Sequence, residues 1–367
     1  MPSTRDRIRG SVLGQALGDA LGAPFEFAAP GAAGDGGITG LTSFTGAPGP
    51  HGPWLSPAPV GTGTDDVRYN RVFIDLVVDL GGGMPDAAEL ARRLLDVYEH
   101  PGAYFPGYED LARRQFEMWE GVSRGCLGQP SSLVPGVSPV VLATRSVGLN
   151  YPTIAGLLIM PSAGLLFPGD PEAAYHAAYM AAFFDVAYAR EATALFAAAQ
   201  SLAMAGLPTA ELVAATLAMD PLQLGGYFGG PFIKDNLPGL LERARGLRQH
   251  ELAAWLSAEL RHFSVFDPYR ALAITFAALL AHENEPMLAL LVAVNQMDID
   301  SQGAVRRFAD IDCYGSITGA LAGTIHGAAA LPADMVQAVL DSNRDVYGLD
   351  LDDCARRLSG AILAEPV

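Results

Sequence analysis

Two short acidic runs carry the side chains best suited to chemistry in this sequence. The first is Thr64, Asp65 and Asp66, and the second is Asp310 and Asp312 followed by Cys313. Negative side chains are favoured where helices begin, so either run alone could be a helix cap. Carboxylates gathered in one place repel one another unless cations neutralise them, and Mg²⁺ or Mn²⁺ prefers such hard oxygen ligands. Asp66 and Asp312 are 246 residues apart, so spacing alone does not show that the runs meet.

The composition argues against several classes of partner. The formal net charge is −17, so the field of the protein repels nucleic acid and anionic membrane surfaces. The apolar stretches 151–167 and 271–294 are interrupted by Pro161 and by the polar run 282–286, so neither predicts a membrane span. The first residues lack an apolar signal core, and we therefore expect a cytoplasmic protein.

Cysteine and lysine usage argues against two further kinds of site. Cys126, Cys313 and Cys354 are far apart and lack CxxC spacing, which argues against a disulfide framework and against a structural zinc site. Lys234 is the single lysine, and its neighbours do not form a phosphate-binding P-loop.

Helical periodicity dominates the chain and must position the acidic runs. Apolar residues from Ile8 to Leu21 recur on one helical face, which predicts a first helix after a cap at Thr4 or Asp6. Further helices are predicted over 65–80, 86–99, 108–123, 171–185, 189–205, 208–219, 250–262, 268–282, 286–296, 313–328, 333–343 and 350–363. Strand-like alternation is scarce. We therefore predict an all-α protein with one compact multi-helical domain over 1–367, and long Gly/Pro-rich loops at 29–63 and 221–238.

Glycines recur every four residues in two of these helices. They are Gly10, Gly14, Gly18 and Gly22 in the first helix and Gly315, Gly319, Gly323 and Gly327 near the C-terminus. An interior glycine costs a helix about 1 kcal/mol relative to alanine. Close approach of another backbone compensates for that cost, so we expect both helices near the centre of the fold and near each other.

Several ordered motifs together resemble the ADP-ribosylglycohydrolase family, which includes the glycohydrolase that reactivates dinitrogenase reductase. The run RIRGSVLGQALGDALGAPFEF over 7–27 is similar to the opening helix of that family. Thr64-Asp65-Asp66 resembles its TDD metal motif, and 310–323 resembles its C-terminal DxD[TS] motif with the helix that follows. The segment 169–172, GDPE, also matches a central motif. The resemblance spans almost the whole chain.

This resemblance implies an all-α fold and a centre of two Mg²⁺ ions, with Mn²⁺ as an alternative. The implied metal ligands are Thr64, Asp65, Asp66, Asp310 and Asp312, with Cys313 in the position of the last ligand and Glu26 close by. It also implies catalytic roles for Glu26, Asp65 and Asp312, because two neighbouring cations orient a ribose diol and polarise a water while carboxylates assist attack at C1′.

The sequence departs from the family pattern at three places. Cys313 stands where Thr or Ser is usual, and sulfur is a softer and weaker ligand for magnesium unless it is ionised. The segments around Met160 and Asp185 lack the motifs of arginine-ADP-ribose hydrolases. Asp185 and Tyr188 stand where one of these motifs would be, and the sequence leaves open whether they face the pocket. Asp298-Ile299-Asp300-Ser301 competes as a DxD[ST] motif. We prefer Asp310 and Asp312, because the glycine-striped helix follows only them, and expect 298–300 in a solvated loop.

These patterns predict a magnesium-dependent hydrolase of a ribosyl bond. Its substrate is expected to be a small ribosyl compound such as a nucleoside, with an ADP-ribosylated protein as the alternative substrate. A non-enzymatic, crystallin-like or binding protein on the same fold is the alternative from another class, and it predicts decay of the acidic ligands. Most of these ligands are present.

Overall fold

Helix α1 (Thr4–Gly22) opens the fold and lies at its centre. The Ser3 hydroxyl caps it by accepting a hydrogen bond from the backbone N–H of Asp6 at 3.2 Å. The predicted cap at Thr4 or Asp6 is therefore wrong by one to three residues, because the preceding serine already supplies the oxygen that the first turn needs. Nearly every residue from Arg7 to Gly22 is buried, as expected for a helix surrounded by others.

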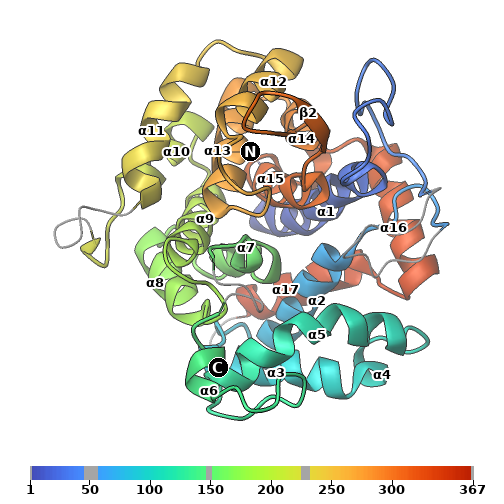
Figure 1. Cartoon of the computed structure of the whole chain (residues 1–367), viewed down its shortest axis with the longest axis vertical. Coiled ribbons are helices and arrows are strands. Elements are labelled where there is room, and N and C mark those ends of the chain that lie inside the picture. Colours follow the sequence, from blue (N-terminus) through green and yellow to red (C-terminus); the bar gives the residue numbers. More distant parts are fainter. Residues whose placement is uncertain (1, 45–56, 146–150, 225–231, 365–367) are drawn as a thin grey trace.

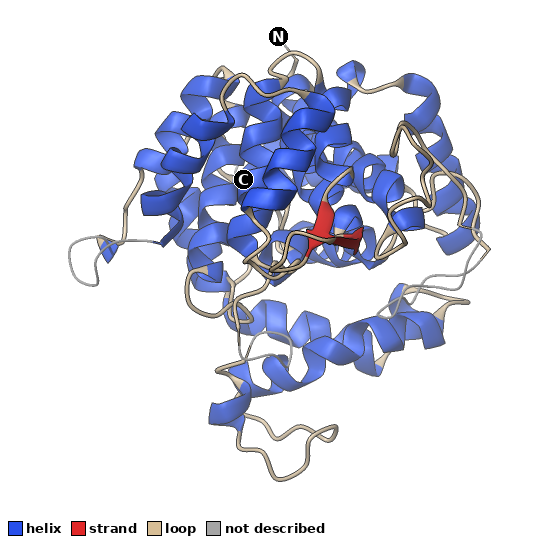
Figure 2. Ribbon diagram, turned by 45° about the horizontal axis from the view of Figure 1, so that its top comes forward, coloured by secondary structure: helices blue, strands red, loops and turns tan. Residues whose placement is uncertain are grey.

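The computed structural model describes residues 2–44, 57–145, 151–224 and 232–364, and parts of both predicted long loops lie outside these ranges. Within them the regular secondary structure is almost entirely helical (Figures 1 and 2), which confirms the all-α prediction. The other α-helices are α2 (Asp65–Asp79), α3 (Ala87–Glu99), α4 (Pro101–Tyr104), α5 (Glu109–Cys126), α6 (Pro139–Leu142), α7 (Ala155–Ile159), α8 (Pro171–Ala181), α9 (Ala189–Met204), α10 (Thr209–Ala218), α11 (Phe232–Ala244), α12 (Gln249–Glu259), α13 (Pro268–Ala281), α14 (Pro286–Val294), α15 (Ile311–His326), α16 (Ala333–Tyr347) and α17 (Leu351–Leu363).

The two glycine-striped helices, α1 and α15, pack antiparallel with their backbones in contact, as the sequence predicts. A Cβ atom added to Gly14 would lie 2.2 Å from the carbonyl oxygen of Gly319, and one added to Gly18 would lie 1.9 Å from that of Gly315. No side chain fits at these levels, so glycine is required for the two axes to come this close. The pairing places the beginning of α15 beside the end of α1.

Some elements differ from the prediction. Helix α11 begins at Phe232, inside the predicted loop 221–238, and contains Pro238, so its glycine- and proline-rich start masks the helical pattern. Short helices α4, α6 and α7 were not predicted, because four or five residues show no period. Strands β1 (Met297–Ile299) and β2 (Val305–Phe308) form an antiparallel hairpin, shown in red in Figure 2. The loop expected at 298–300 is therefore wrong for Asp298 and Ile299, which belong to β1, whereas Asp300 lies in the turn between the strands.

Ion pairs explain why the hairpin carries the two aspartates of the competing motif. Asp298 pairs with Arg307 across the strands at 3.1 Å, and Asp300 lies 3.7 Å from Arg306. The turn is closed by hydrogen bonds from the backbone N–H groups of Gln302 and Ala304 to the Asp300 side chain. Among the described residues, no helix is long and apolar enough to cross a membrane.

Candidate metal centre

Three chain segments bring the two acidic runs together. The glycine contacts set the start of α15, and therefore Asp312, against the end of α1. Asp19 on α1 accepts a hydrogen bond from the backbone N–H of Thr64 at 2.8 Å, and Thr64 is the N-cap of α2. The beginnings of α2 and α15 are thus fixed to the same part of α1, and Asp66 comes to face the first turn of α15.

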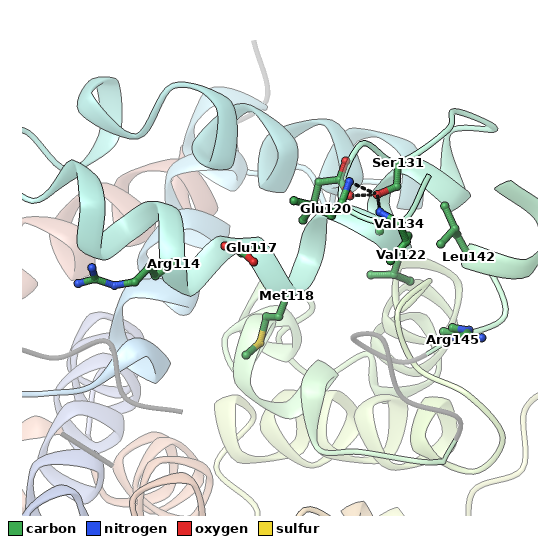
Figure 3. A pocket seen from close by; sticks show the side chains of 11 residues that line it. Arg114, Glu117, Met118, Glu120, Val122, Ser131, Val134, Leu142 and Arg145 are labelled. Carbon is green, nitrogen blue, oxygen red and sulfur yellow. Dashed lines mark hydrogen bonds between the residues drawn. The ribbon is translucent and has the colours of Figure 1, made fainter. Parts of the chain in front are cut away.

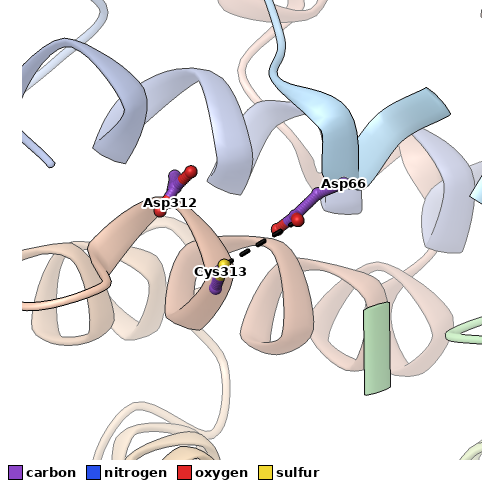
Figure 4. Close-up of side chains that lie close together, drawn as sticks. All are labelled: Asp66, Asp312 and Cys313. Atoms are coloured by element: carbon purple, nitrogen blue, oxygen red, sulfur yellow. Dashed lines mark hydrogen bonds between the residues drawn. The ribbon is translucent and has the colours of Figure 1, made fainter. Parts of the chain in front are cut away.

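The convergence produces a first group of three potential ligands, Asp66, Asp312 and Cys313 (Figure 4). One ligand atom from each lies within 4.8 Å of the other two. The Cys313 thiol points toward the Asp66 carboxylate, with 3.8 Å between Sγ and Oδ1. Residues 246 positions apart in the sequence therefore meet, which their spacing could not show.

A second group contains oxygen ligands alone. Glu26 follows the short 3₁₀ helix η1 (Ala23–Phe25) at the end of α1. Its carboxyl lies with those of Asp310 and Asp312 so that one oxygen from each is within 4.8 Å of the others. Asp312 belongs to both groups. Two cation positions that share one carboxylate would lie side by side, as in two-metal hydrolytic sites.

The carboxyls of this centre are buried close to one another, and this makes their negative charge unfavourable. Burial first, and then the charge of Asp312, raises the pKa of Asp66 and of Glu26 well above the ordinary range. Burial and Asp65 raise the pKa of Asp312 to about 7. Burial and the Asp310 carboxylate likewise raise the pKa of the Cys313 thiol. A bound cation would relieve both the desolvation and the repulsion.

The oxygens of this centre have coordination capacity that the protein does not use. Among the described residues, the buried atoms Oδ2 of Asp66, Oδ2 of Asp310 and Oδ1 of Asp312 have no hydrogen-bond partner. Buried carboxylate oxygens normally accept hydrogen bonds, so the free lone pairs of these three oxygens are suited to a bound cation. Several carboxylates and one thiol, with no histidine among them, are suited to divalent cations.

Thr64 and Asp65 lie at the edge of the centre. The Thr64 hydroxyl accepts a long hydrogen bond, 3.4 Å, from the backbone N–H of Asp66, so this side chain caps α2. Asp65 lines the cavity beside the centre and raises the pKa values of Asp312 and Tyr69 through its charge. The structure therefore places Thr64 as a helix cap and Asp65 at the cavity wall, while both three-residue groups consist of other side chains.

A cavity of about 270 Å³ opens onto the carboxylates. One side is acidic, and the opposite walls are mainly apolar, formed by α2, α5, α7 and the segment before α13. These walls are Tyr69, Met118, Trp119, Thr153, Ile154, Ala155, Leu158 and Phe266. No arginine, lysine or histidine is among the described lining residues, and the residues outside the described ranges contain no arginine or lysine.

Comparison with known proteins identifies the family of this chain. The family model for ADP-ribosylglycohydrolases matches residues 1–366. The chain belongs to the ADP-ribosylglycohydrolase family. The structure is also similar to a solved structure named an ADP-ribosylglycohydrolase-related protein complex, with a TM-score of 0.60 and 21% identity over 99% of this chain and 100% of that one. No curated protein matches the sequence. As a member of this family, the protein is a hydrolase acting on glycosyl bonds.

Beside the cavity lies a wider groove of about 510 Å³ along α5 (Figure 3). Met118 lines both spaces, so it forms part of the wall between them. In the groove, the Ser131 hydroxyl donates a hydrogen bond to the buried Glu120 carboxylate. Arg114 and Arg145 also line this groove, whereas they do not line the metal-centre cavity.

Sequence reasoning missed two parts of the site of this family member. The first is Asp19, which lies in the opening motif but was not predicted to belong to the site. An aspartate within a run of apolar residues and glycines was the signal that could have identified it, and the structure shows that it is buried. The apolar walls from α5 and α7 left no signal, because they depend on tertiary packing. Asp185 does not line the cavity; it accepts hydrogen bonds from the N–H of Gly156 on α7 and from the Thr193 hydroxyl. Tyr188 donates to Asp267 instead.

Proposed function

We propose that this protein is a divalent-metal-dependent hydrolase that cleaves the bond from ribose C1′ to an uncharged, nucleobase-like leaving group. One observation carries the proposal: two groups of ligands share Asp312 at the acidic end of an otherwise apolar cavity. Two cations, Mg²⁺ or Mn²⁺ at the oxygen ligands, would hold the ribose hydroxyls and polarise a water when bound.

Some side chains have more than one role in this proposal. Asp66, Asp310, Asp312 and Cys313 would hold the ions together with Glu26, and Thr64 fixes the start of α2. Glu26, Asp65 and Asp312 are the proposed catalytic residues, because they border the space in which C1′ would lie. A carboxylate there accepts a proton from the attacking water while the water oxygen bonds to C1′ and the glycosidic bond breaks. The leaving group then takes up that proton from the carboxyl.

The walls support an uncharged leaving group. Trp119, with 2% of its surface exposed, and Phe266 offer aromatic surface for a planar ring. Away from the metal ions, a pyrophosphate would require donors or cationic side chains, and the described lining provides no cationic side chain. The net charge of −17 gives no long-range attraction for a phosphate either.

The test is a competition under one Mg²⁺ concentration. We expect kcat/KM to be higher for at least one nucleoside than for ADP-ribosylated arginine, and we expect turnover to disappear when a chelator removes the metal. The Phe266→Ala variant should lower kcat/KM for the nucleoside without changing Mg²⁺ affinity measured by calorimetry. A clear preference for the ADP-ribosyl conjugate would refute the proposed leaving group, and turnover without metal would refute the mechanism.

A second candidate function is removal of ADP-ribose from a protein. The neighbouring groove favours it, because Arg114 and Arg145 line this groove on opposite sides of Met118, and a guanidinium pairs well with pyrophosphate oxygens. In that case the double variant Arg114→Ala/Arg145→Ala would lower kcat/KM for ADP-ribosylated arginine at least tenfold. The same variant would leave nucleoside hydrolysis unchanged.

A further inference from the structure

The two ligand groups differ in the kind of atom that they offer. The group of Glu26, Asp310 and Asp312 presents oxygen alone. The group of Asp66, Asp312 and Cys313 presents two carboxylates and one sulfur. Oxygen-only positions suit Mg²⁺ and Mn²⁺, whereas thiolate ligands favour softer divalent ions such as Zn²⁺.

The sulfur-containing group is enclosed and incompletely satisfied. Asp66 and Asp312 are each 2% exposed and Cys313 is 8% exposed. Oδ2 of Asp66 and Oδ1 of Asp312 are buried atoms without a hydrogen-bond partner among the described residues. Unpartnered oxygens on the two carboxylates beside the thiol are evidence for a cation-binding position, and this evidence is independent of the cysteine itself.

The distance between sulfur and oxygen fits a tetrahedral ion. Zinc binds sulfur at about 2.3 Å and carboxylate oxygen at about 2.0 Å, so two such ligands at a tetrahedral angle lie about 3.5 Å apart. Sγ of Cys313 and Oδ1 of Asp66 are 3.8 Å apart. Small side-chain movements would complete the coordination, with Asp312 as a third ligand and water as a fourth.

We infer that the two positions of this centre bind different ions. The position formed by Asp66, Asp312 and Cys313 selects a zinc-class divalent ion through a thiolate bond, and the position formed by Glu26, Asp310 and Asp312 takes Mg²⁺ or Mn²⁺. This inference rests on the proposed metal-dependent function and adds the identity of one ion. It also gives a chemical reason for cysteine at a place where relatives of this family usually have an oxygen ligand.

The alternative is that Cys313 is a small buried side chain that packs without binding metal. The protein contains a matched example, because Cys354 on α17 is also buried, at 3% exposure. Its Sγ lies 4.0 Å from a guanidinium nitrogen of Arg357, and it belongs to neither ligand group. Cys354 therefore provides the control for a buried thiol outside the centre.

The test uses Co²⁺ as a spectroscopic substitute for Zn²⁺ in the full-length protein. We expect one equivalent of Co²⁺ to produce a sulfur-to-cobalt charge-transfer absorption in the near ultraviolet, and Zn²⁺ to displace it. The Cys313→Ser variant should lose this absorption and bind Zn²⁺ at least tenfold more weakly. The Cys354→Ser variant should retain both properties. Cys313→Thr, which restores the usual oxygen ligand, should keep or strengthen Mg²⁺ binding measured by calorimetry.

The outcomes separate this inference from the proposed function. No charge-transfer absorption in the wild-type protein, or the same absorption in Cys313→Ser, would overturn the inference. If Mg²⁺ still activated ribose release in that case, the proposed function would stand alone. Failure of Mg²⁺, Mn²⁺, Zn²⁺ and Co²⁺ to bind at all would overturn both. Tenfold weaker Mg²⁺ binding in Cys313→Thr would also contradict the inference, because the thiol would then be a ligand of Mg²⁺.

Discussion

The carboxylate of Asp19 accepts the backbone N–H of Thr64 at 2.8 Å, and this bond ties the central helix α1 to the first residue of the TDD motif. Asp19 is fully buried, and its other oxygen, Oδ1, has no hydrogen-bond partner among the described residues. Burial raises the pKa of Asp19, and the charge of Asp312 raises it further. A side chain that is this unfavourable to bury has a positioning role: it fixes the beginning of α2.

The first prediction concerns Asp19. Asp19→Ala removes the acceptor for Thr64, so we expect Mg²⁺ affinity measured by calorimetry to fall about 10- to 100-fold, as for other residues that orient metal ligands. Asp19→Asn keeps an oxygen in place and should stay close to wild type. Asp79→Ala, at the far end of α2 and paired with Arg93, is the control. Wild-type affinity in Asp19→Ala would show that Thr64 holds its position without this bond.

The second prediction separates the two DxD motifs. Asp66→Asn and Asp312→Asn each remove a charge from the centre without changing side-chain volume. We expect ribose release to fall by at least about two powers of ten, with an unchanged circular dichroism spectrum. Asp300→Asn, in the β1–β2 turn, should retain full activity. Near-normal turnover in both centre variants would place the active site elsewhere.

The third prediction tests the contact between α1 and α15. A Cβ atom on Gly319 would lie 1.9 Å from the carbonyl oxygen of Gly14, and backbone cannot move aside as a side chain can. We expect Gly319→Ala to lower the free energy of unfolding in urea by about 3 kcal/mol or more. Gly360 in α17 meets nothing within 4 Å, so Gly360→Ala should raise that free energy by up to about 1 kcal/mol. Equal effects of the two substitutions would argue against the observed packing.

The fourth prediction concerns pH. Burial raises the pKa of Asp185 to about 7, well above the ordinary 3.8 of the unfolded chain. Through Asp185 the folded protein therefore binds more protons than the unfolded chain between these values, and this group alone makes stability fall as pH rises from about 4 to 7, by up to about 1.4 kcal/mol per pH unit. Asp185→Asn keeps acceptors for Gly156 and should flatten this decline in urea titrations. Asp345 is exposed, so the control variant Asp345→Asn should leave the slope unchanged. A slope as steep as that of the wild type in Asp185→Asn would refute the raised pKa of Asp185.

Local patterns predicted most of the helices, since apolar residues at helical spacing mark a buried face whatever it packs against. The boundaries of the long helices agree within four residues, and α2 begins at Asp65 as its capping residues indicate. Helix α7 could not be found this way, because its five residues are buried all round and show no polar face. Helix α11 was missed where Pro238 interrupts the pattern.

The site was less accessible to sequence reasoning than the fold. The residue types of Asp66, Asp310 and Asp312 indicated cation chemistry, but the meeting of the two runs required the glycine contacts and the Asp19 hydrogen bond. The sharing of Asp312 between two ligand groups depends on side-chain directions that no spacing encodes. The apolar walls of the cavity depend on how α5 and α7 dock, and tertiary packing alone determines that.

The pairing of α1 with α15 has a consequence for how the protein is made. About 290 residues separate the end of the first helix from the beginning of its partner. At ribosomal rates of 5–20 residues per second, the newly made α1 waits roughly 15 to 60 s before α15 emerges. During that time its glycine face is uncovered in a chain that is already rich in apolar helices. The central helix pair therefore forms only when nearly the whole chain has been synthesised. Truncated translation products that lack α15 should be recognised by chaperones and proteases as unfolded.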